Sequence, residues 1–584
     1  MSLADDVSGR ALEATTEPTV QAKPGLVRAI SWTSAFWIAS GVPALLVFSV
    51  GYIATLTGPV SILIWPASVL IGIAMAFVYA EMAGMFPEKS GGPPVFGAQA
   101  WKRYFRPIAP LNIWGYWFAW SPVISIGGLL MGDYIVAQWL PSSWDLHWGP
   151  FHITLAFVLG AAIISAVFWI NHFGIKESAA IQFVLGICSL VPLGLMIVVP
   201  LFEGKLHLSY LTPLAVPGAH GWDVFKLVAA GLFVAAWSAY AFETAVVYTA
   251  EFQRPQRDTP RAIFSAGGLC LFFYGLGPFV LYAVVGGKTI QADPSTALVP
   301  LSRAVFGAAG QLLIVMLLVA LLLSINTSIL GSSRTLYQAS KDGWTFRFMQ
   351  RTSERGVPLR AMGFDLGVNL LLMALGNPVY ILAASTIGYM SFNTLDLTAG
   401  FLLRRDAARA RRPYRAPTLM IRIGILLACL NFILLFVGSP SWGWKAVATG
   451  WGVTLLGVAI YYWRRWDDAR RRRVTAPAGS SDEALIGALS PATLAAPQAG
   501  RATATGHPGD PVALADPEDP LGPIQRWANL APMIAYLALT ATVLTLAENW
   551  NVTALFIIGF AMLAAWATGF IVAAGRPACR WYRW

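Results

Sequence analysis

The residue best suited to chemistry is a single acid, Glu243, inside an apolar stretch of membrane length. The surrounding sequence, LFVAAWSAYAFETAVVYTAEFQRPQRDTPRAI, becomes charged and proline-bounded only at its end. A carboxylate at bilayer depth costs several kcal/mol unless it faces the interior of a helix bundle or a water-filled cavity. We therefore expect Glu243 to be functional, by handling a proton or by balancing a cationic substrate. The alternative is a structural acid that accepts hydrogen bonds from backbone or hydroxyl groups.

An interrupted apolar run near the N-terminus, WIASGVPALLVFSVG, is the second candidate for chemistry. Pro43 removes a helical hydrogen bond, and Gly41 lets the backbone open. N–H groups freed around Ser40, Gly41 and Val42 would suit a substrate carboxylate at a positive helix end. Inverted-repeat transporters bind their substrates at such discontinuous helices. The alternative is a simple proline kink, which transmembrane helices tolerate.

The stretch that matches this run lies five spans later, where AAWSAYAFE contains Ser238 and small residues but neither Gly nor Pro. A break is therefore not evident here from residue propensity. Trp237 and Glu243 are six residues apart, a spacing that does not put them on one face of an unbroken helix. They are expected to line one cavity only if the helix unwinds between them.

Composition identifies the elements that must position these residues. The chain has 584 residues, of which 57% are hydrophobic and 12% are charged, whereas soluble domains carry about 25% charged residues. Since roughly 20 apolar residues cross a bilayer as a helix, we predict a polytopic helical membrane protein, whose long first, third and eighth spans must be tilted, broken or extended. The predicted core spans are 29–55, 60–86, 108–140, 152–172, 179–202, 223–250, 261–286, 301–338, 360–377, 379–403, 418–438 and 443–462, and two further spans are predicted at 527–547 and 551–574.

The distribution of Lys and Arg predicts the orientation. The loops after predicted spans two, six, eight and ten hold four, three, six and six of these residues, whereas 203–221 and 287–300 hold one each. Basic loops stay on the cytosolic side, so we expect both termini to be cytosolic in the cytoplasmic membrane. The net charge of +11 therefore predicts lipid contact and no nucleic-acid partner. The four cysteines and six histidines show no metal-site spacing, so we expect no metal and no cofactor.

The chain divides into five predicted segments. Residues 1–28 form a cytosolic N-terminal tail, and residues 29–463 form the twelve-span core. Residues 464–525 begin RRWDDARRRR, become rich in Ala, Pro, Gly and Asp, and are expected to be a disordered cytosolic linker. Residues 526–575 hold the two extra spans, and 576–584 form a cytosolic tail. The linker is either a simple tether or an autoinhibitory segment.

Four stretches together resemble the amino acid–polyamine–organocation transporter superfamily over residues 30–463. IASGVP resembles its unwound first-span motif, and AEMAGMFPEKSGGPPVFGAQAW resembles its second-span and loop motif. FETAVVYTAEFQRPQRDTPRAI and SSRTLYQASKDGWTFRFMQRTSERGVPLRAM resemble its sixth-span exit and eighth-span loop. The resemblance implies an all-α, five-plus-five inverted repeat with broken first and sixth helices.

The resemblance also implies roles for individual residues. The backbone of Ser40, Gly41 and Val42 would bind the substrate carboxylate, Trp237 would be an aromatic gate, and Glu243 would couple protonation to exchange. The other residues expected at or near the substrate are Tyr116, Ser238, Ala241, Asn326, Ser328 and Asn393. Ala39 and Ala241 stand where the family usually has Gly, which narrows the space near the substrate or stiffens the break.

These features predict a secondary transporter of amino acids or related amines that works by alternating access, with H⁺ or Na⁺ coupling or by exchange. The alternative is a substrate sensor built on a transporter fold. A channel would need rings of like residues or a filter motif, and the sequence shows neither. A membrane enzyme would need a catalytic dyad or a metal set on facing spans, so we expect no enzymatic activity.

Overall fold

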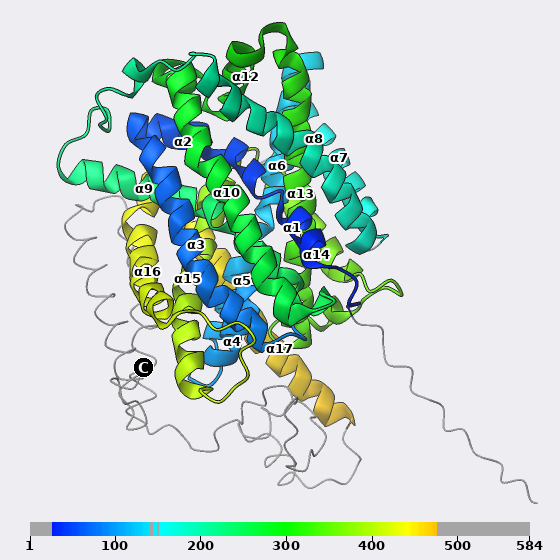
Figure 1. Cartoon of the computed structure of the whole chain (residues 1–584). Coiled ribbons are helices and arrows are strands. Elements are labelled where there is room, and N and C mark those ends of the chain that lie inside the picture. Colours follow the sequence, from blue (N-terminus) through cyan, green and yellow to red (C-terminus); the bar gives the residue numbers. More distant parts are fainter. Residues whose placement is uncertain (1–25, 105, 141–143, 149–150, 174, 476–584) are drawn as a thin grey trace, which may run out of the picture.

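The computed structural model describes residues 26–475 except 105, 141–143, 149–150 and 174. Its helices pack side by side in one bundle, with α4 and the end of α17 at one end and α12 at the other (Figure 1). The two extra spans, the last tail, most of the N-terminal tail and the linker from residue 476 onward lie outside the described residues. Their predicted roles stay predictions.

The first half of the described chain carries both halves of the interrupted first helix and a small hairpin. Labels with η denote 3-10 helices. In chain order the elements are α1 (Trp32–Ala39), η1 (Pro43–Leu45), α2 (Leu46–Thr57), η2 (Gly58–Val60), α3 (Ser61–Met85), α4 (Pro93–Trp101), α5 (Ile108–Trp120), α6 (Pro122–Trp139), β1 (Asp145–Trp148), β2 (Phe151–Thr154), α7 (Leu155–Asn171), α8 (Ile175–Phe202) and η3 (Leu208–Leu211).

The second half carries the longest helices of the bundle. In chain order its elements are α9 (Trp222–Ala239), η4 (Ala241–Glu251), α10 (Pro255–Val285), α11 (Gly287–Ala292), η5 (Pro294–Thr296), α12 (Leu298–Phe306), η6 (Gly307–Ala309), α13 (Gly310–Lys341), η7 (Arg347–Gln350), α14 (Leu359–Met373), α15 (Pro378–Asp406), α16 (Thr418–Val437), η8 (Ser439–Trp442) and α17 (Trp444–Thr475).

The fold is mostly helical, as predicted. Within the described ranges, eight helical segments are long and apolar enough to cross a membrane, and one of them, Trp32–Met85, covers two predicted spans. Each of the twelve predicted core spans contains at least one helix. The number of crossings and the five-plus-five repeat stay predictions.

Three long spans are interrupted, which agrees with the expectation that they could not be single straight helices. The first breaks between α1 and η1, the third between α5 and α6, and the eighth between α12 and α13. Pro43 and Pro122 lie at the first two breaks, where a missing N–H removes a helical hydrogen bond. Gly307, with φ +55°, begins the third interruption.

Two features differ from the prediction. β1 and β2 form an antiparallel hairpin between α6 and α7, so the chain is not entirely helical. Helix α17 continues to Thr475, twelve residues beyond the predicted end of the core at 463. Its last turns are supported by ion pairs one turn apart, Arg464 with Asp468 at 2.8 Å and Arg471 with Asp467 at 2.8 Å.

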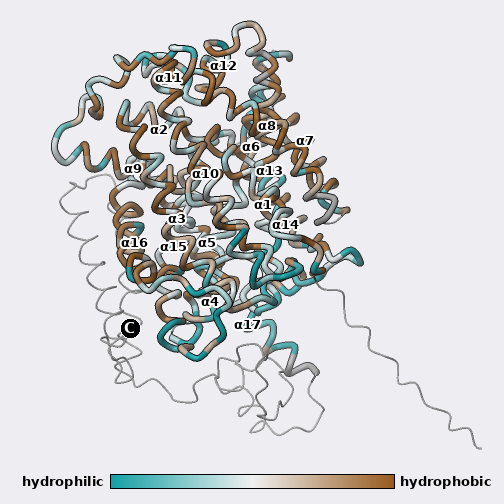
Figure 2. Tube along the Cα trace, viewed as in Figure 1, coloured by the Kyte–Doolittle hydropathy of each residue, from teal (hydrophilic) through white to brown (hydrophobic). Residues whose placement is uncertain are grey.

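Hydrophilic residues gather at the end of the bundle that carries α4 and the end of α17 (Figure 2). Buried ion pairs link separate elements at this end. Arg404 of α15 pairs with Glu81 of α3, and Arg334 of α13 pairs with Glu251 of η4 at 2.5 Å. These pairs connect helices that are far apart in the sequence. Each holds its two helices together, because separating them would leave a buried charge without its partner.

Helices α5 and α15 cross at a contact between two glycines. A Cβ added at Gly388 would lie 2.4 Å from the carbonyl oxygen of Gly115. Small residues at such crossings let the backbones of membrane helices approach closely. This crossing brings the last turn of α5 next to the middle of α15, where the candidate site lies.

We predict that Gly388→Ala lowers the apparent melting temperature of the purified protein. The added methyl group would overlap backbone, and overpacking of this kind costs about 1–3 kcal/mol. Gly275→Ala on α10 is the matched control, because a Cβ there meets no atom within 4 Å. Equal melting temperatures for the two variants would show that the α5–α15 contact is looser than the structure indicates.

Candidate functional site

Glu243 is buried where three elements meet, with only 1% of its surface exposed. The indole Nε1–H of Trp120, at the end of α5, donates a hydrogen bond to Glu243 Oε1 at 3.2 Å. The hydroxyl of Tyr389, on α15, donates to Glu243 Oε2 at 3.0 Å. One carboxylate therefore joins η4 to α5 and α15, and both of these donors are neutral groups.

The helix that carries Glu243 changes its type just before the acid. Helix α9 ends at Ala239, and an eleven-residue 3-10 helix, η4, begins at Ala241. Runs of 3-10 helix longer than three or four residues are uncommon and often mark a hinge or strain. The backbone N–H of Glu243 donates to the Tyr240 carbonyl at 3.3 Å. The helix thus departs from regular α geometry between Trp237 and Glu243, without a Gly or Pro to cause it.

Trp237 and Glu243 both reach the last turn of α5. The indole N–H of Trp237 donates to the carbonyl of Ala119 at 2.9 Å, one residue before the Trp120 that holds Glu243. Ser328 of α13 donates from its hydroxyl to the Trp120 carbonyl at 2.6 Å. The end of α5 is therefore the place where these three predicted residues come together.

The first helix break packs against α13 and α10. The Gly41 carbonyl accepts a hydrogen bond from Ser324 Oγ at 2.9 Å, and the Val42 carbonyl accepts one from the Tyr274 hydroxyl at 2.6 Å. A Cβ at Gly41 would lie 2.3 Å from Thr327 Oγ1, so only glycine fits. Ser40 bonds back to its own helix, from Oγ to the Trp37 carbonyl. Within the described chain, the N–H of Gly41 has no acceptor.

The two interrupted helices touch one another. Ser49 of α2 and Ser238 of α9 share a hydrogen bond between their hydroxyls at 3.1 Å. The ring centroids of Phe48 and Trp237 are 6.2 Å apart, and α1 packs against η4. Ala241 is buried at the first turn of η4. The first break and the change from α9 to η4 are thus neighbours in space although about 200 residues separate them.

Tyr116 lies one turn before Trp120 on α5 and is fully buried. Its ring packs edge-on against Phe392, with centroids 4.7 Å apart, and its hydroxyl lies against Gly92, where a Cβ would be 2.9 Å away. The hydroxyl has no hydrogen-bond partner among the residues that the structure describes. Tyr116 therefore places one polar atom beside the Glu243 cluster, close to Glu243 and Thr244.

Two predicted residues face elsewhere or contact Glu243 only indirectly. Asn326 donates to Gln182 Oε1 at 2.5 Å and accepts from Asn171 at 2.6 Å, so its side chain binds α7 and α8. Asn393 accepts from the Tyr79 hydroxyl at 2.6 Å and donates to the Tyr389 carbonyl at 2.8 Å. The Asn393 side chain therefore bonds to α3 and to its own helix, one turn from the Tyr389 whose hydroxyl holds Glu243.

Sequence reasoning missed both donors to Glu243. Trp120 is four residues after Tyr116, and Tyr389 is four residues before Asn393, so each lies one helical turn from a residue that was identified. Residues at this spacing share a helix face. The face of each helix was the available signal, but the sequence does not show which of its members meets an acid on a third helix.

The C-terminal end of η4 is bound to neighbouring elements by main-chain hydrogen bonds and a buried ion pair. Gly91, in the SGG stretch after α3, donates its N–H to the Val247 carbonyl at 2.9 Å, and the Thr335 hydroxyl donates to the Gly91 carbonyl at 2.9 Å. The buried pair of Glu251 and Arg334 lies next along η4. Together these contacts bind η4 to α13 at the polar end of the bundle.

Comparisons with known proteins place the chain in a family. A family model described as amino acid permease matches residues 30–460. A lysine-specific permease of Lactococcus lactis subsp. cremoris is 26% identical over 300 residues, which cover 46% of this chain and 54% of that protein. A Bacillus subtilis amino-acid permease is 24% identical over 264 residues, covering 44% of this chain and 54% of the relative.

The chain thus spans about half the length of these two curated relatives. A D-serine/D-alanine/glycine transporter of Escherichia coli K12 is 21% identical over 379 residues, covering 60% of this chain and 77% of the relative. The region that the family model matches, residues 30–460, contains every residue of the Glu243 cluster and both helix breaks. The sequence resemblance is confirmed, and the chain belongs to the amino acid permease family of the amino acid–polyamine–organocation superfamily.

Proposed function

We propose that this protein is a secondary transporter that moves amino acids or related amines across the cytoplasmic membrane by alternating access. The observation that carries the proposal is the cluster around Glu243, a buried carboxylate with neutral donors at the meeting point of two interrupted helices. The printed names of the relatives, which refer to lysine, D-serine, D-alanine and glycine, support amino acids as the substrate class.

The substrate carboxylate would bind at the first break, where the N–H of Gly41 would donate to it. Helix ends with unsatisfied N–H groups favour anions. The rest of the substrate would lie toward Trp237, Tyr116 and Ser328, which meet at the end of α5. Trp237 would cover the substrate in the occluded state, because its indole is held at Ala119 and its ring lies beside Phe48, close to the first break.

Glu243 would couple transport to proton movement. A carboxylate held by Trp120 and Tyr389 can gain or lose a proton without breaking an ion pair, because both donors are uncharged. The same carboxylate could instead balance a cationic substrate or bind Na⁺. These roles differ in whether transport responds to pH or to sodium.

Alternating access requires the contacts at the polar end of the bundle to open. The pairs Glu251–Arg334 and Lys89–Asp342, at 2.5 and 2.8 Å, join separate elements there. We place this end and both termini on the cytosolic side, because it carries the arginine-rich loops. Release to the cytosol would then separate η4 from α13 by breaking Glu251–Arg334.

We predict that Glu243→Gln removes the pH dependence of amino acid uptake into proteoliposomes while substrate binding is retained. The amide keeps the shape of the protonated acid but cannot exchange a proton. Glu354→Gln, which neutralises an exposed acid in the connection between η7 and α14, is the matched control and should keep the wild-type pH profile. A pH profile unchanged in Glu243→Gln would exclude proton coupling at this residue, and a response to Na⁺ instead would identify the other ion.

We predict that Trp237→Leu binds substrate but exchanges it at least roughly tenfold more slowly, a barrier increase of about 1.4 kcal/mol. Leucine covers less of the substrate and leaves the Ala119 carbonyl without its indole donor. Trp169→Leu is the control, since Trp169 is 64% exposed on α7 and lies outside the cluster. Counterflow of radiolabelled amino acid measures the rate.

Equal exchange rates for Trp237→Leu and the control would contradict a gating role. A wild-type protein that binds amino acids but shows no counterflow would contradict the transporter proposal itself. That second outcome would favour a substrate sensor on the same fold.

A further inference from the structure

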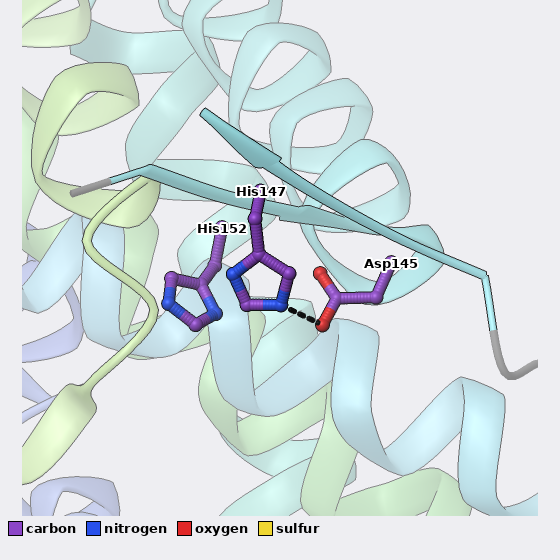
Figure 3. A group of neighbouring side chains, drawn as sticks. All are labelled: Asp145, His147 and His152. Carbon is purple, nitrogen blue, oxygen red and sulfur yellow. Dashed lines mark ion pairs between the residues drawn. The ribbon is translucent and has the colours of Figure 1, made fainter. Parts of the chain in front are cut away.

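The hairpin between α6 and α7 gathers three potential metal ligands on one face. In its antiparallel register His147 lies opposite His152, and Asp145 lies opposite Thr154. Successive side chains of a strand point to opposite faces, so Asp145 and His147, two residues apart, share a face with His152. Figure 3 shows the carboxylate and both imidazole rings turned toward one another on this face.

The three side chains are close enough to hold one ion. One ligand atom from each residue lies within 4.8 Å of the other two. His147 Nε2 is 2.7 Å from Asp145 Oδ2, and the centroids of the two imidazole rings are 4.0 Å apart. Ligand atoms around tetrahedral Zn²⁺, with bonds of about 2.0–2.1 Å, lie roughly 3.3 Å from each other. Small side-chain rotations would therefore complete the site.

We propose that Asp145, His147 and His152 form a binding site for a divalent transition metal, with Zn²⁺ as the best match. Two imidazoles and one carboxylate are a ligand set that zinc uses, with the fourth position open to water. Imidazole suits zinc, copper and nickel, whereas Mg²⁺ and Ca²⁺ take oxygen ligands. The Asp145–His147 ion pair alone needs no third residue, and His152 on the opposite strand is what makes a metal site.

The site is accessible and partly anchored. The side chains of His147 and Asp145 are 57% and 39% exposed, so an ion can reach them without a change in the fold. Strand β2 is fixed to the segment between α14 and α15, because the His152 N–H donates to the Ala374 carbonyl at 2.7 Å. A bound ion would fasten β1 to this anchored strand and so to the start of α15, the helix that carries Tyr389.

The test uses the purified full-length protein, stripped of metal with a chelator and titrated with ZnCl₂ in a calorimeter. We expect one Zn²⁺ to bind per chain and binding to be lost in His147→Ala and in His152→Ala. His207→Ala is the matched control, because His207 is also exposed and lies in a different connection of the bundle. It should bind zinc as the wild type does.

A second readout is thermal stability, since an ion that binds only the folded state raises the melting temperature. Zn²⁺ should raise it for the wild type and for His207→Ala but not for His147→Ala or His152→Ala, and Mg²⁺ should have no effect. Zinc binding of equal affinity in the wild type and both hairpin variants, or no zinc binding by the wild type, would overturn the proposal. Both readouts are independent of transport.

Discussion

The central constraint on this protein is a carboxylate that must be buried in a low-dielectric interior without a cation among its hydrogen-bond donors. Glu243 meets this constraint through hydrogen bonds from Trp120 and Tyr389, which lie on different helices. A buried charged or polar group that loses such a partner costs more than the bond contributes, so the three elements are bound to one arrangement. Any movement that separates η4 from α5 or α15 must therefore remove a hydrogen bond from the Glu243 carboxylate.

The interrupted helices impose a second demand, because each break frees backbone groups that must find partners. At the first break the Gly41 and Val42 carbonyls are satisfied by Ser324 and Tyr274. The Ala119 carbonyl, near the break in the third span, is satisfied by Trp237. Hydroxyl and indole donors on neighbouring helices thus satisfy carbonyl groups at or beside the breaks. The Gly41 N–H has no acceptor in the described chain.

The polar end and the hairpin use different means to join elements. At the polar end, buried arginine–carboxylate pairs bind η4 to α13 and α3 to α15. Breaking such a pair leaves an uncompensated charge, so opening there is costly unless the charges become hydrated. At the hairpin, Asp145, His147 and His152 are exposed and lie near the start of α15. An ion there would constrain α15 without entering the bundle.

By itself, the sequence determined the class of protein, the positions of most helices, the family and the break at Ser40–Val42. The class, the helices and the break follow from apolar run length and from Gly and Pro, which act locally. The family follows from the four matching stretches of sequence. Only the tertiary structure decided that Trp120 and Tyr389 hold Glu243, that Asn326 turns to α7 and α8, and that α9 gives way to η4 without a glycine. It also brought His147 and His152 together, although their spacing matches no familiar zinc motif. The partners of Glu243 are 123 and 146 residues away, and contacts at such distances depend on how helices pack, which local residue preferences do not encode.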